Sequence, residues 1–243
     1  MLTSGGWVAV VAAPFVGSFL GVLILRLPRA RTVVWGRSCC EGCGARLGVA
    51  ELVPVASYVW LGGRCRRCRG AIDPLHWRVE IAATLVALAA WGLGDDAGAV
   101  WAGCVLGWGL LTLGWIDART MLLPDALTLP LLLAGLAATW LGEREALAEH
   151  ALAAALGYGA FAGLAALYRR FRGRDGMGGG DAKLLAAGGA WLGLAALPWV
   201  VFAAAAGALV GAVLSGGIAA TRPVPFGPWL AAAIWLIYLI MRG

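Results

Sequence analysis

Residues 6–25 read GWVAVVAAPFVGSFLGVLIL and contain no charged side chain. A helix of this length rises about 30 Å, which matches the hydrocarbon thickness of a bilayer. The first basic residue is Arg26, so no basic segment precedes the apolar run, and no usual small-residue cleavage site follows it. A signal peptide would have both features. We therefore expect residues 6–25 to form a retained membrane span.

The rest of the chain has the same apolar character. Of 243 residues, 61% are hydrophobic and only 13% are charged, whereas soluble domains have about 25% charged residues. This composition excludes a soluble globule and a disordered chain. The apolar runs are continuous rather than alternating, which favours helices over a membrane barrel. We predict an all-α polytopic membrane protein with about eight transmembrane helices, at 6–25, 79–94, 97–116, 126–141, 147–168, 182–197, 199–220 and 226–241.

The basic residues predict the orientation of these spans. With eight spans, 17 of the 19 Lys and Arg residues fall on one face, ten of them in the connection 26–78. Cytoplasmic loops collect Lys and Arg, so this face is expected in the cytoplasm and both termini outside. The net charge of +6 then reflects topology and attraction to the lipid bilayer rather than nucleic-acid binding. Five Trp residues fall near predicted membrane interfaces, as amphipathic rings prefer: Trp35, Trp77, Trp115, Trp140 and Trp229.

The connection 26–78 contains two C-x2-C pairs separated by 21 residues. Their members are Cys40, Cys43, Cys65 and Cys68. Four thiolates with this spacing are typical of a structural zinc site, and a reducing cytoplasm disfavours disulfides. A short polar segment cannot build a core, so metal binding would supply its folding free energy. The alternative is a reduced pair of redox-active CxxC motifs.

Two aspartates are predicted at the cytoplasmic ends of spans. Asp117 ends the third span and Asp181 opens the sixth, directly after the glycine-rich stretch 176–180. Carboxylates within about 3–4 Å of each other share one proton, so one can activate water while the other protonates a leaving amine. Taken singly, Asp181 could instead cap a helix and Asp117 could be a solvated loop residue. Together with the glycines, they favour peptide-bond hydrolysis that needs no cofactor.

Further residues beside this pair are candidates for the same site. Gly178, Gly179 and Gly180 would let a substrate strand approach the backbone closely. Asp125 is a rival for the acid pair, although capping of the fourth span is the favoured interpretation. Lys183 would compensate an aspartate or extend to the membrane surface.

Several of these motifs, in this order, resemble the prepilin leader peptidase/N-methyltransferase family, the GxGD-type aspartic proteases of the membrane. They are Pro14-Phe-Val-Gly-Ser-Phe-Leu-Gly21 with Arg26-Leu-Pro28, Ser38 with the first cysteine pair, Val53-Pro-Val-Ala-Ser-Tyr58, Gly63-Arg-Cys-Arg66 with Cys68, Ile116-Asp117 with Leu123-Pro-Asp125, Gly176-Met-Gly-Gly-Gly-Asp181, and Val224-Pro-Phe-Gly-Pro228. The resemblance covers most of the chain. It departs at His76-Trp77, where the family tends to have Tyr-Pro before a glutamate that corresponds to Glu80.

The resemblance implies an enzyme of the bacterial inner membrane. Its catalytic pair would be Asp117 and Asp181, rather than Asp125. Its substrate would be a type IV prepilin or pseudopilin, cleaved after the Gly that ends a short basic leader, on the cytoplasmic side. Many members then methylate the new amino-terminal residue, usually Phe, with S-adenosylmethionine, and Glu80 would contribute to this step. The alternative for Glu80 is an interfacial ion pair with Arg78 or a neighbour.

These features suggest three parts of the chain: a first transmembrane helix at 1–25, a cytoplasmic zinc-binding loop at 26–78 and a transmembrane aspartic peptidase domain at 79–243. Two other functions stay open from the residues alone. Intramembrane carboxylates also serve in proton relays of transporters. A zinc loop could equally belong to a non-enzymatic scaffold that recruits pilus or secretion assembly machinery.

Overall fold

The computed structural model describes residues 5–33, 38–40, 42–173, 178–214 and 225–242. Across these ranges the regular elements are helices. The chain also forms two isolated β-bridges, Cys39 with Arg46 and Arg64 with Ala71. The chain divides into two compact units, Met1–Cys104 and Val105–Gly243. Helix α4 (Ala97–Thr120) begins in the first unit and ends in the second.

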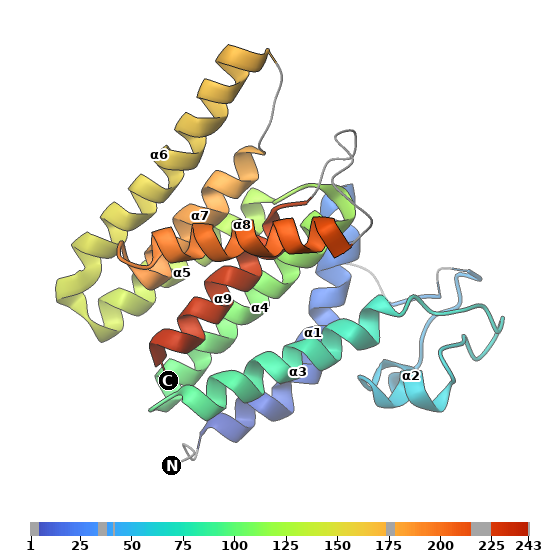
Figure 1. Cartoon of the computed structure of the whole chain (residues 1–243). Coiled ribbons are helices and arrows are strands. Elements are labelled where there is room, and N and C mark those ends of the chain that lie inside the picture. The colour runs from blue at the N-terminus through green and yellow to red at the C-terminus, as the bar shows by residue number, and fades with distance from the viewer. Residues whose placement is uncertain (1–4, 34–37, 41, 174–177, 215–224, 243) are drawn as a thin grey trace. The chain divides into compact units, whose positions relative to one another are not determined.

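Each of the eight predicted spans corresponds to one helix of the described residues (Figure 1). Besides α4, these are α1 (Gly6–Arg26), α3 (Leu75–Leu93), α5 (Asp125–Gly142), α6 (Leu147–Arg172), α7 (Gly179–Leu192), α8 (Leu197–Leu214) and α9 (Gly227–Arg242). The short elements are η1 (Leu27–Arg29), η2 (Val49–Leu52), α2 (Ala56–Trp60) and η3 (Arg144–Ala146). The predicted all-helical class is therefore confirmed.

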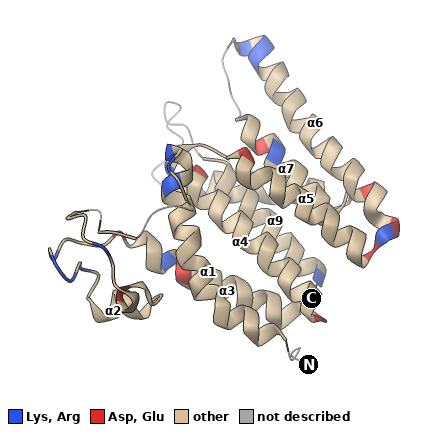
Figure 2. Ribbon diagram, turned by 180° about the vertical axis from the view of Figure 1, so that it is seen from behind, with Lys and Arg blue, Asp and Glu red and all other residues tan. Residues whose placement is uncertain are grey.

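Length and composition support fewer spans than the eight expected. Among the described residues, five helices, α1, α4, α5, α6 and α8, are long and apolar enough to cross a membrane, and α9 is apolar but shorter. Helix α7 has 14 residues and rises only about 21 Å, and α3 carries Arg78 and Glu80 near its start. The chain is a multi-pass membrane protein, but the number eight is not confirmed. In Figure 2 the charged residues gather near helix ends and in the connection 27–74, as lipid exposure of the helix bodies requires.

In the first unit, small residues allow α1 and α3 to pack closely. Gly17 and Gly21 stand one turn apart on α1, and Ala9 and Ala13 continue the same buried stripe. A Cβ added at Gly17 would lie 2.6 Å from the Cα of Glu80. Small residues at four-residue spacing bring helix backbones together in membranes. This packing fixes Glu80 at the α1–α3 interface.

In the second unit, α7 is the central helix. From Asp181 to Leu192 every residue except Lys183 is buried, and α5, α6 and α9 pack around the helix. Its glycines again allow close contact: a Cβ at Gly189 would lie 2.6 Å from the backbone carbon of Ala153 on α6. Burial on all sides explains how a short helix of this kind is stabilised, because it is covered by protein rather than by lipid.

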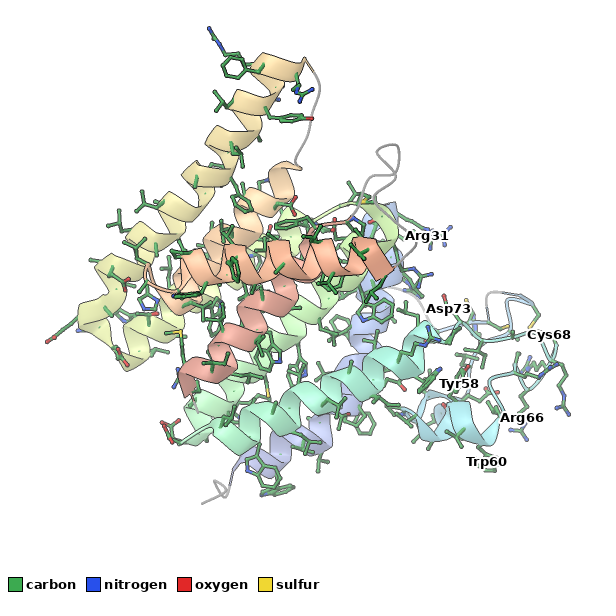
Figure 3. The ribbon with its side chains drawn as sticks, viewed as in Figure 1. Arg31, Tyr58, Trp60, Arg66, Cys68 and Asp73 are labelled. Carbon is green, nitrogen blue, oxygen red and sulfur yellow. The ribbon has the colours of Figure 1, made fainter. Side chains whose placement is uncertain are left out.

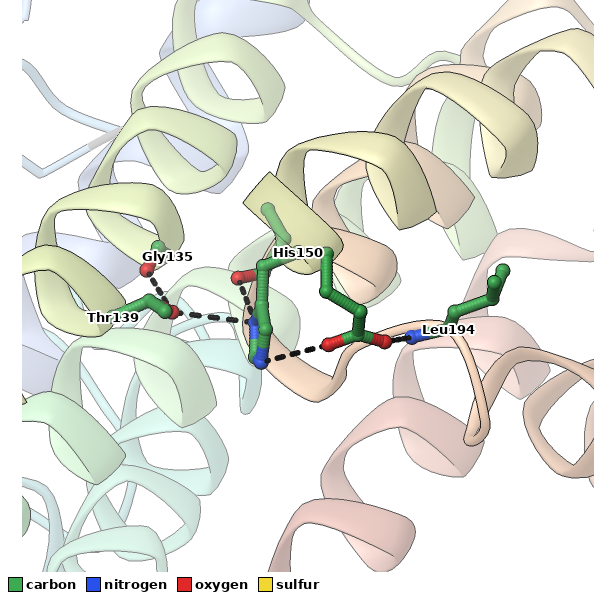
Figure 4. Close-up of polar contacts among 6 residues, drawn as sticks. Gly135, Thr139, His150 and Leu194 are labelled. Carbon is green, nitrogen blue, oxygen red and sulfur yellow. Dashed lines mark hydrogen bonds and ion pairs between the residues drawn. The ribbon is translucent and has the colours of Figure 1, made fainter. Parts of the chain in front are cut away.

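The carboxyl end of α7 is held by a polar network (Figure 4). The His150 ring nitrogen Nδ1 lies 3.0 Å from the Ala190 carbonyl oxygen and 3.2 Å from Thr139 Oγ1. A Glu149 carboxylate oxygen accepts the Leu194 N–H at 2.5 Å. Between these contacts the chain turns at Gly193, whose φ of 77° suits glycine. The break between the sixth and seventh predicted spans therefore lies at Gly193, whereas the sequence suggested Pro198, which stands in the first turn of α8.

Candidate active site

Asp117 lies near the carboxyl end of α4, with 6% of its surface exposed. Its Oδ2 accepts a hydrogen bond from the backbone N–H of Gly227 at 3.0 Å. Gly227 is the first residue of α9, so this N–H has no carbonyl partner within its own helix. A Cβ at Gly227 would lie 2.7 Å from Oδ2 of Asp117. The contact therefore requires glycine at this position.

Asp181 lies in the first turn of α7 and is 8% exposed. It is the third helical residue after the cap position, which Gly178 occupies. The Gly178 backbone N–H bonds to the Asp181 carboxylate, the arrangement by which a third-position acid closes a capping box. Asp181 is therefore not the cap residue of α7, which was the structural role that its sequence position also allowed.

Asp117 and Asp181 belong to the same unit, and their carboxylates are near enough for the charge of one to act on the other. The carboxyl end of α4 and the amino ends of α7 and α9 meet there, although the two acids are separated by 63 intervening residues. Two buried carboxylates in electrostatic contact disfavour double ionisation, so the pair is suited to hold one proton. This arrangement can act as an acid and a base in one reaction.

Asp125, the third acid of this region, has a different partner. Its Oδ1 lies 2.5 Å from Nζ of Lys183, and both side chains are partly exposed. Asp125 is the first residue of α5, and the cap position before it is Pro124. The expected cap role of Asp125 is therefore wrong, and the expected compensation of an aspartate by Lys183 is correct. The ion pair links the starts of α5 and α7.

The glycines before Asp181 differ in their surroundings. Gly176 and Met177 lie outside the described residues. A Cβ at Gly180 would lie 2.6 Å from the Cβ of Leu123, so this glycine allows the connection between α4 and α5 to pack against α7. Gly179 has open space on its Cβ side. Of the three described glycines before Asp181, Gly179 has no described atom within 4 Å of an added Cβ, so a further chain could approach its backbone.

The four cysteines of the C-x2-C pairs form one cluster. Their Sγ atoms all lie within 4.8 Å of one another, and those of Cys40 and Cys68 are 3.8 Å apart. Tetrahedral zinc with Zn–S bonds of about 2.3 Å needs sulfur separations of about 3.8 Å, so the donor set fits this ion. Hydrogen bonds from the backbone N–H groups of Cys68 and Arg67 lower the pKa of the Cys65 thiol to about 7, which favours the ligand form. The remaining neighbour, Cys39, is exposed and outside the cluster.

Glu80 lies in the first unit and is 5% exposed. Its Oε2 accepts the backbone N–H of Val55 at 2.7 Å. The ion pair with Arg78, which was the structural alternative for this residue, is absent among the described residues. Glu80 instead ties the segment before α2 to α3.

Sequence reasoning missed the roles of Gly227 and Val55. The sequence marks Gly227 only as part of the last motif, and nothing local relates it to Asp117, which stands 110 residues earlier. Val55 has a φ of 59°, which β-branched residues rarely adopt, so residue type gave no signal. Its position between two quoted motif residues, Pro54 and Ala56, was the only available clue.

Comparisons with known proteins support one family. Residues 11–93 match the model for the Bacterial Peptidase A24 N-terminal domain, and residues 104–216 match that for the Type IV leader peptidase family. A protein of Burkholderia pseudomallei (strain 1026b) is 40% identical over 252 residues, covering 92% of this chain and 82% of its own. One of Aeromonas hydrophila is 38% identical (92% and 87%), and one of Neisseria gonorrhoeae is 34% identical (95% and 88%). All three are named prepilin leader peptidase/N-methyltransferase, and no solved structure matches the chain. The chain therefore belongs to the prepilin leader peptidase/N-methyltransferase family.

Proposed function

We propose that this protein cleaves the basic leader from a type IV prepilin or pseudopilin, after the Gly that ends the leader, with Asp117 and Asp181 as the catalytic pair. The observation that carries the proposal is the placement of two buried carboxylates where the carboxyl end of α4 meets the amino ends of α7 and α9. The names of the relatives supply the substrate class. The basic connections support a reaction at the cytoplasmic face of the bacterial inner membrane, with both termini outside.

The proposed chemistry needs only the two carboxyl groups and water. The ionised aspartate takes a proton from water while the water oxygen bonds to the scissile carbonyl carbon. The protonated aspartate gives its proton to the leaving nitrogen as the C–N bond breaks. One proton enters the pair and one leaves it, so the pair returns to its starting state. Gly179, with open space beside it, would receive the substrate backbone, while Gly178, Gly180, Lys183 and Asp125 position the start of α7.

The second proposed activity is methylation of the new amino-terminal residue, usually Phe. S-adenosylmethionine, when bound, supplies the methyl group. The zinc-binding loop 26–78 would be part of this function, with Cys40, Cys43, Cys65 and Cys68 holding a structural zinc ion that stabilises the loop. The chain would then have three parts: a first helix at 1–25, the zinc-binding loop at 26–78 and a peptidase domain at 79–243. Pilus or secretion assembly machinery is the proposed setting for both activities.

The test uses the purified full chain in detergent, a prepilin peptide and mass spectrometry of the products. The unaltered chain should release the leader, and Asp117→Asn and Asp181→Asn should each lose at least a thousandfold in rate while keeping their thermal stability. Asp96→Asn is the matched control, since it changes an acid at the other end of α4 and keeps an oxygen for the Ala99 N–H. Full activity of Asp181→Asn would overturn the proposal. Cleavage by the purified chain also distinguishes an enzyme from a transporter or scaffold.

A further inference from the structure

The Glu80 carboxylate is only partly satisfied by the protein. Oε2 binds the Val55 N–H, whereas Oε1 has no hydrogen-bond or ion-pair partner among the described residues. The residue is nonetheless 95% buried, since its exposed fraction is 5%. Burying a carboxylate is costly unless donors or a cation surround it, so such groups normally have several partners. Oε1 is not among the fully buried side-chain atoms that lack a partner, so a donor from outside the chain can reach it.

A second unpaired polar atom lies one helical turn away. The indole N–H of Trp77 is buried, and it has no hydrogen-bond partner among the described residues. An indole nitrogen can only donate, so it needs an oxygen or other acceptor. Trp77 and Glu80 are three residues apart on α3, a spacing that puts them on the same side of a helix. One side of α3 thus presents an unpaired donor beside a half-paired acceptor.

The segment that covers these two residues is held in a strained conformation. Val55 has φ 59° and ψ −52°, and the Ala56 N–H bonds to the Pro54 carbonyl at 2.5 Å. This is a γ-turn with positive φ at its centre, a rare and strained conformation. Glu80 binds the N–H of that same residue. Strained backbone of this kind concentrates at functional sites, where the surroundings hold it in place.

Aromatic stacking fixes the other end of the covering segment. The rings of Tyr58 and Trp77 stack with centroids 5.7 Å apart and 29° between their planes. Figure 3 shows Tyr58 beside the start of α3 and Trp60 on the opposite side of α2, where Trp60 is 84% exposed. The indole of Trp77 is therefore oriented by Tyr58 while its N–H stays without a partner. Two contacts, one polar and one aromatic, hold the segment over the unpaired atoms.

We propose that Glu80 and Trp77 form a binding site for an α-amino group whose Cα is bonded to a carbonyl or carboxylate carbon. The ammonium would bind Glu80, and the carbonyl or carboxylate oxygen would accept the Trp77 N–H. This inference rests on the proposed function, in which two molecules carry that chemistry. One is the new amino terminus of the cleaved pilin with its first carbonyl group, and the other is the methionine end of S-adenosylmethionine.

The variants separate binding from support of the segment. Glu80→Gln keeps an oxygen for the Val55 N–H and removes the negative charge. Trp77→Phe keeps a ring for stacking on Tyr58 and removes the donor. Glu51→Gln is the matched control for the first, because the Glu51 carboxylate also accepts a backbone N–H, that of Gly48, at 2.6 Å. Trp60→Phe is the matched control for the second, since it changes an exposed indole on α2.

The experiment is titration calorimetry on the full chain in detergent. The ligands are S-adenosylmethionine alone, a synthetic peptide that begins with the Phe of a cleaved pilin, and the same peptide with its amino group acetylated. We expect Glu80→Gln and Trp77→Phe each to bind at least one of the first two ligands at least tenfold more weakly. Both control variants should bind these ligands as the unaltered chain does. The ligand that is weakened identifies the source of the amino group. The acetylated peptide should bind weakly and show no dependence on Glu80.

Unchanged affinity of both variants for both ligands would overturn the proposed site. Failure of both ligands to bind the unaltered chain would also overturn it. Thermal unfolding of each variant is measured alongside. If Glu80→Gln is destabilised, the ligand affinity of Trp77→Phe is the result that tests the site. Prepilin cleavage by the unaltered chain is measured in the same preparation. Cleavage with unaffected binding in the variants removes this inference alone, whereas a lack of cleavage removes the proposed function.

Discussion

Gly227 donates its backbone N–H to Asp117 across 110 positions of the chain, with 3.0 Å between the nitrogen and Oδ2. The bond orients one carboxylate of the acid pair through the first residue of α9. The donor is the backbone of Gly227, so a substitution at this position would act on Asp117 only through the volume of the added side chain. The last motif of the sequence thereby becomes part of the candidate active site.

We predict that Gly227→Ala lowers prepilin cleavage by at least tenfold, because its Cβ would lie 2.7 Å from the carboxylate and displace it. The measurement is kcat/KM with a prepilin peptide. Gly163→Ala on α6 is the control, since nothing lies within 4 Å of the added atom. Equal activity of the two variants would mean that Asp117 needs no positioning from α9.

The glycines of the α7 start should differ in effect. Gly179→Ala is expected to raise KM without changing thermal stability, because its Cβ meets open space that the substrate would occupy. Gly180→Ala should lower stability, since its Cβ would lie 2.6 Å from that of Leu123. Kinetics and thermal unfolding in detergent measure both. A KM for Gly179→Ala equal to that of the unaltered chain would contradict the role proposed for this glycine.

The ion pair between Asp125 and Lys183 offers a charge-exchange test. Its side chains are partly exposed, so its loss should cost at most about 1 kcal/mol of stability. Reversal of either charge alone, Asp125→Lys or Lys183→Asp, should slow cleavage several-fold by moving the start of α7. The double reversal should restore most of the rate. A double variant no faster than the single ones would indicate that Asp125 or Lys183 contacts the substrate directly.

For the cysteine cluster we expect about one zinc ion per chain by elemental analysis. Cys68→Ser or a chelator should release the metal and speed trypsin cleavage after the nearby exposed arginines, because the loop has little core of its own and would unfold without the metal. Those arginines are Arg64, Arg66, Arg67 and Arg69. Cys39→Ser should keep the metal, since this neighbour lies outside the cluster. A chain that binds no zinc and forms disulfides within each pair would instead support the redox alternative.

The α1–α3 interface predicts a stability effect. Gly17→Ala should destabilise the chain by about 1–3 kcal/mol, because the added Cβ would lie 2.6 Å from the Cα of Glu80. Gly92→Ala on α3 has open space and should be neutral or slightly stabilising. Thermal unfolding in detergent compares the two. If both variants melted alike, α1 and α3 would not be packed through Gly17.

The helix positions could be predicted because apolar runs, charged ends and prolines act locally. The cysteine spacing likewise predicted a cluster, since two short knuckles can close on one centre without knowledge of the rest. The convergence of Asp117 and Asp181 followed from their expected membrane face. In contrast, the contact of Gly227 with Asp117 depends on how α9 packs, and the turn at Val55 depends on Glu80 holding it. Tertiary packing overrides residue preference at both positions, so a single sequence gives no sign of them.

Both α7 and α9 begin at the acid pair, the first with Asp181 in its opening turn and the second with Gly227 against Asp117. The positive ends of two peptide macrodipoles therefore point at one small volume. Under the proposed mechanism, an attacked carbonyl oxygen gains negative charge in that volume, and this field would stabilise it. The same two helices that position the acids would thus also favour the tetrahedral intermediate electrostatically.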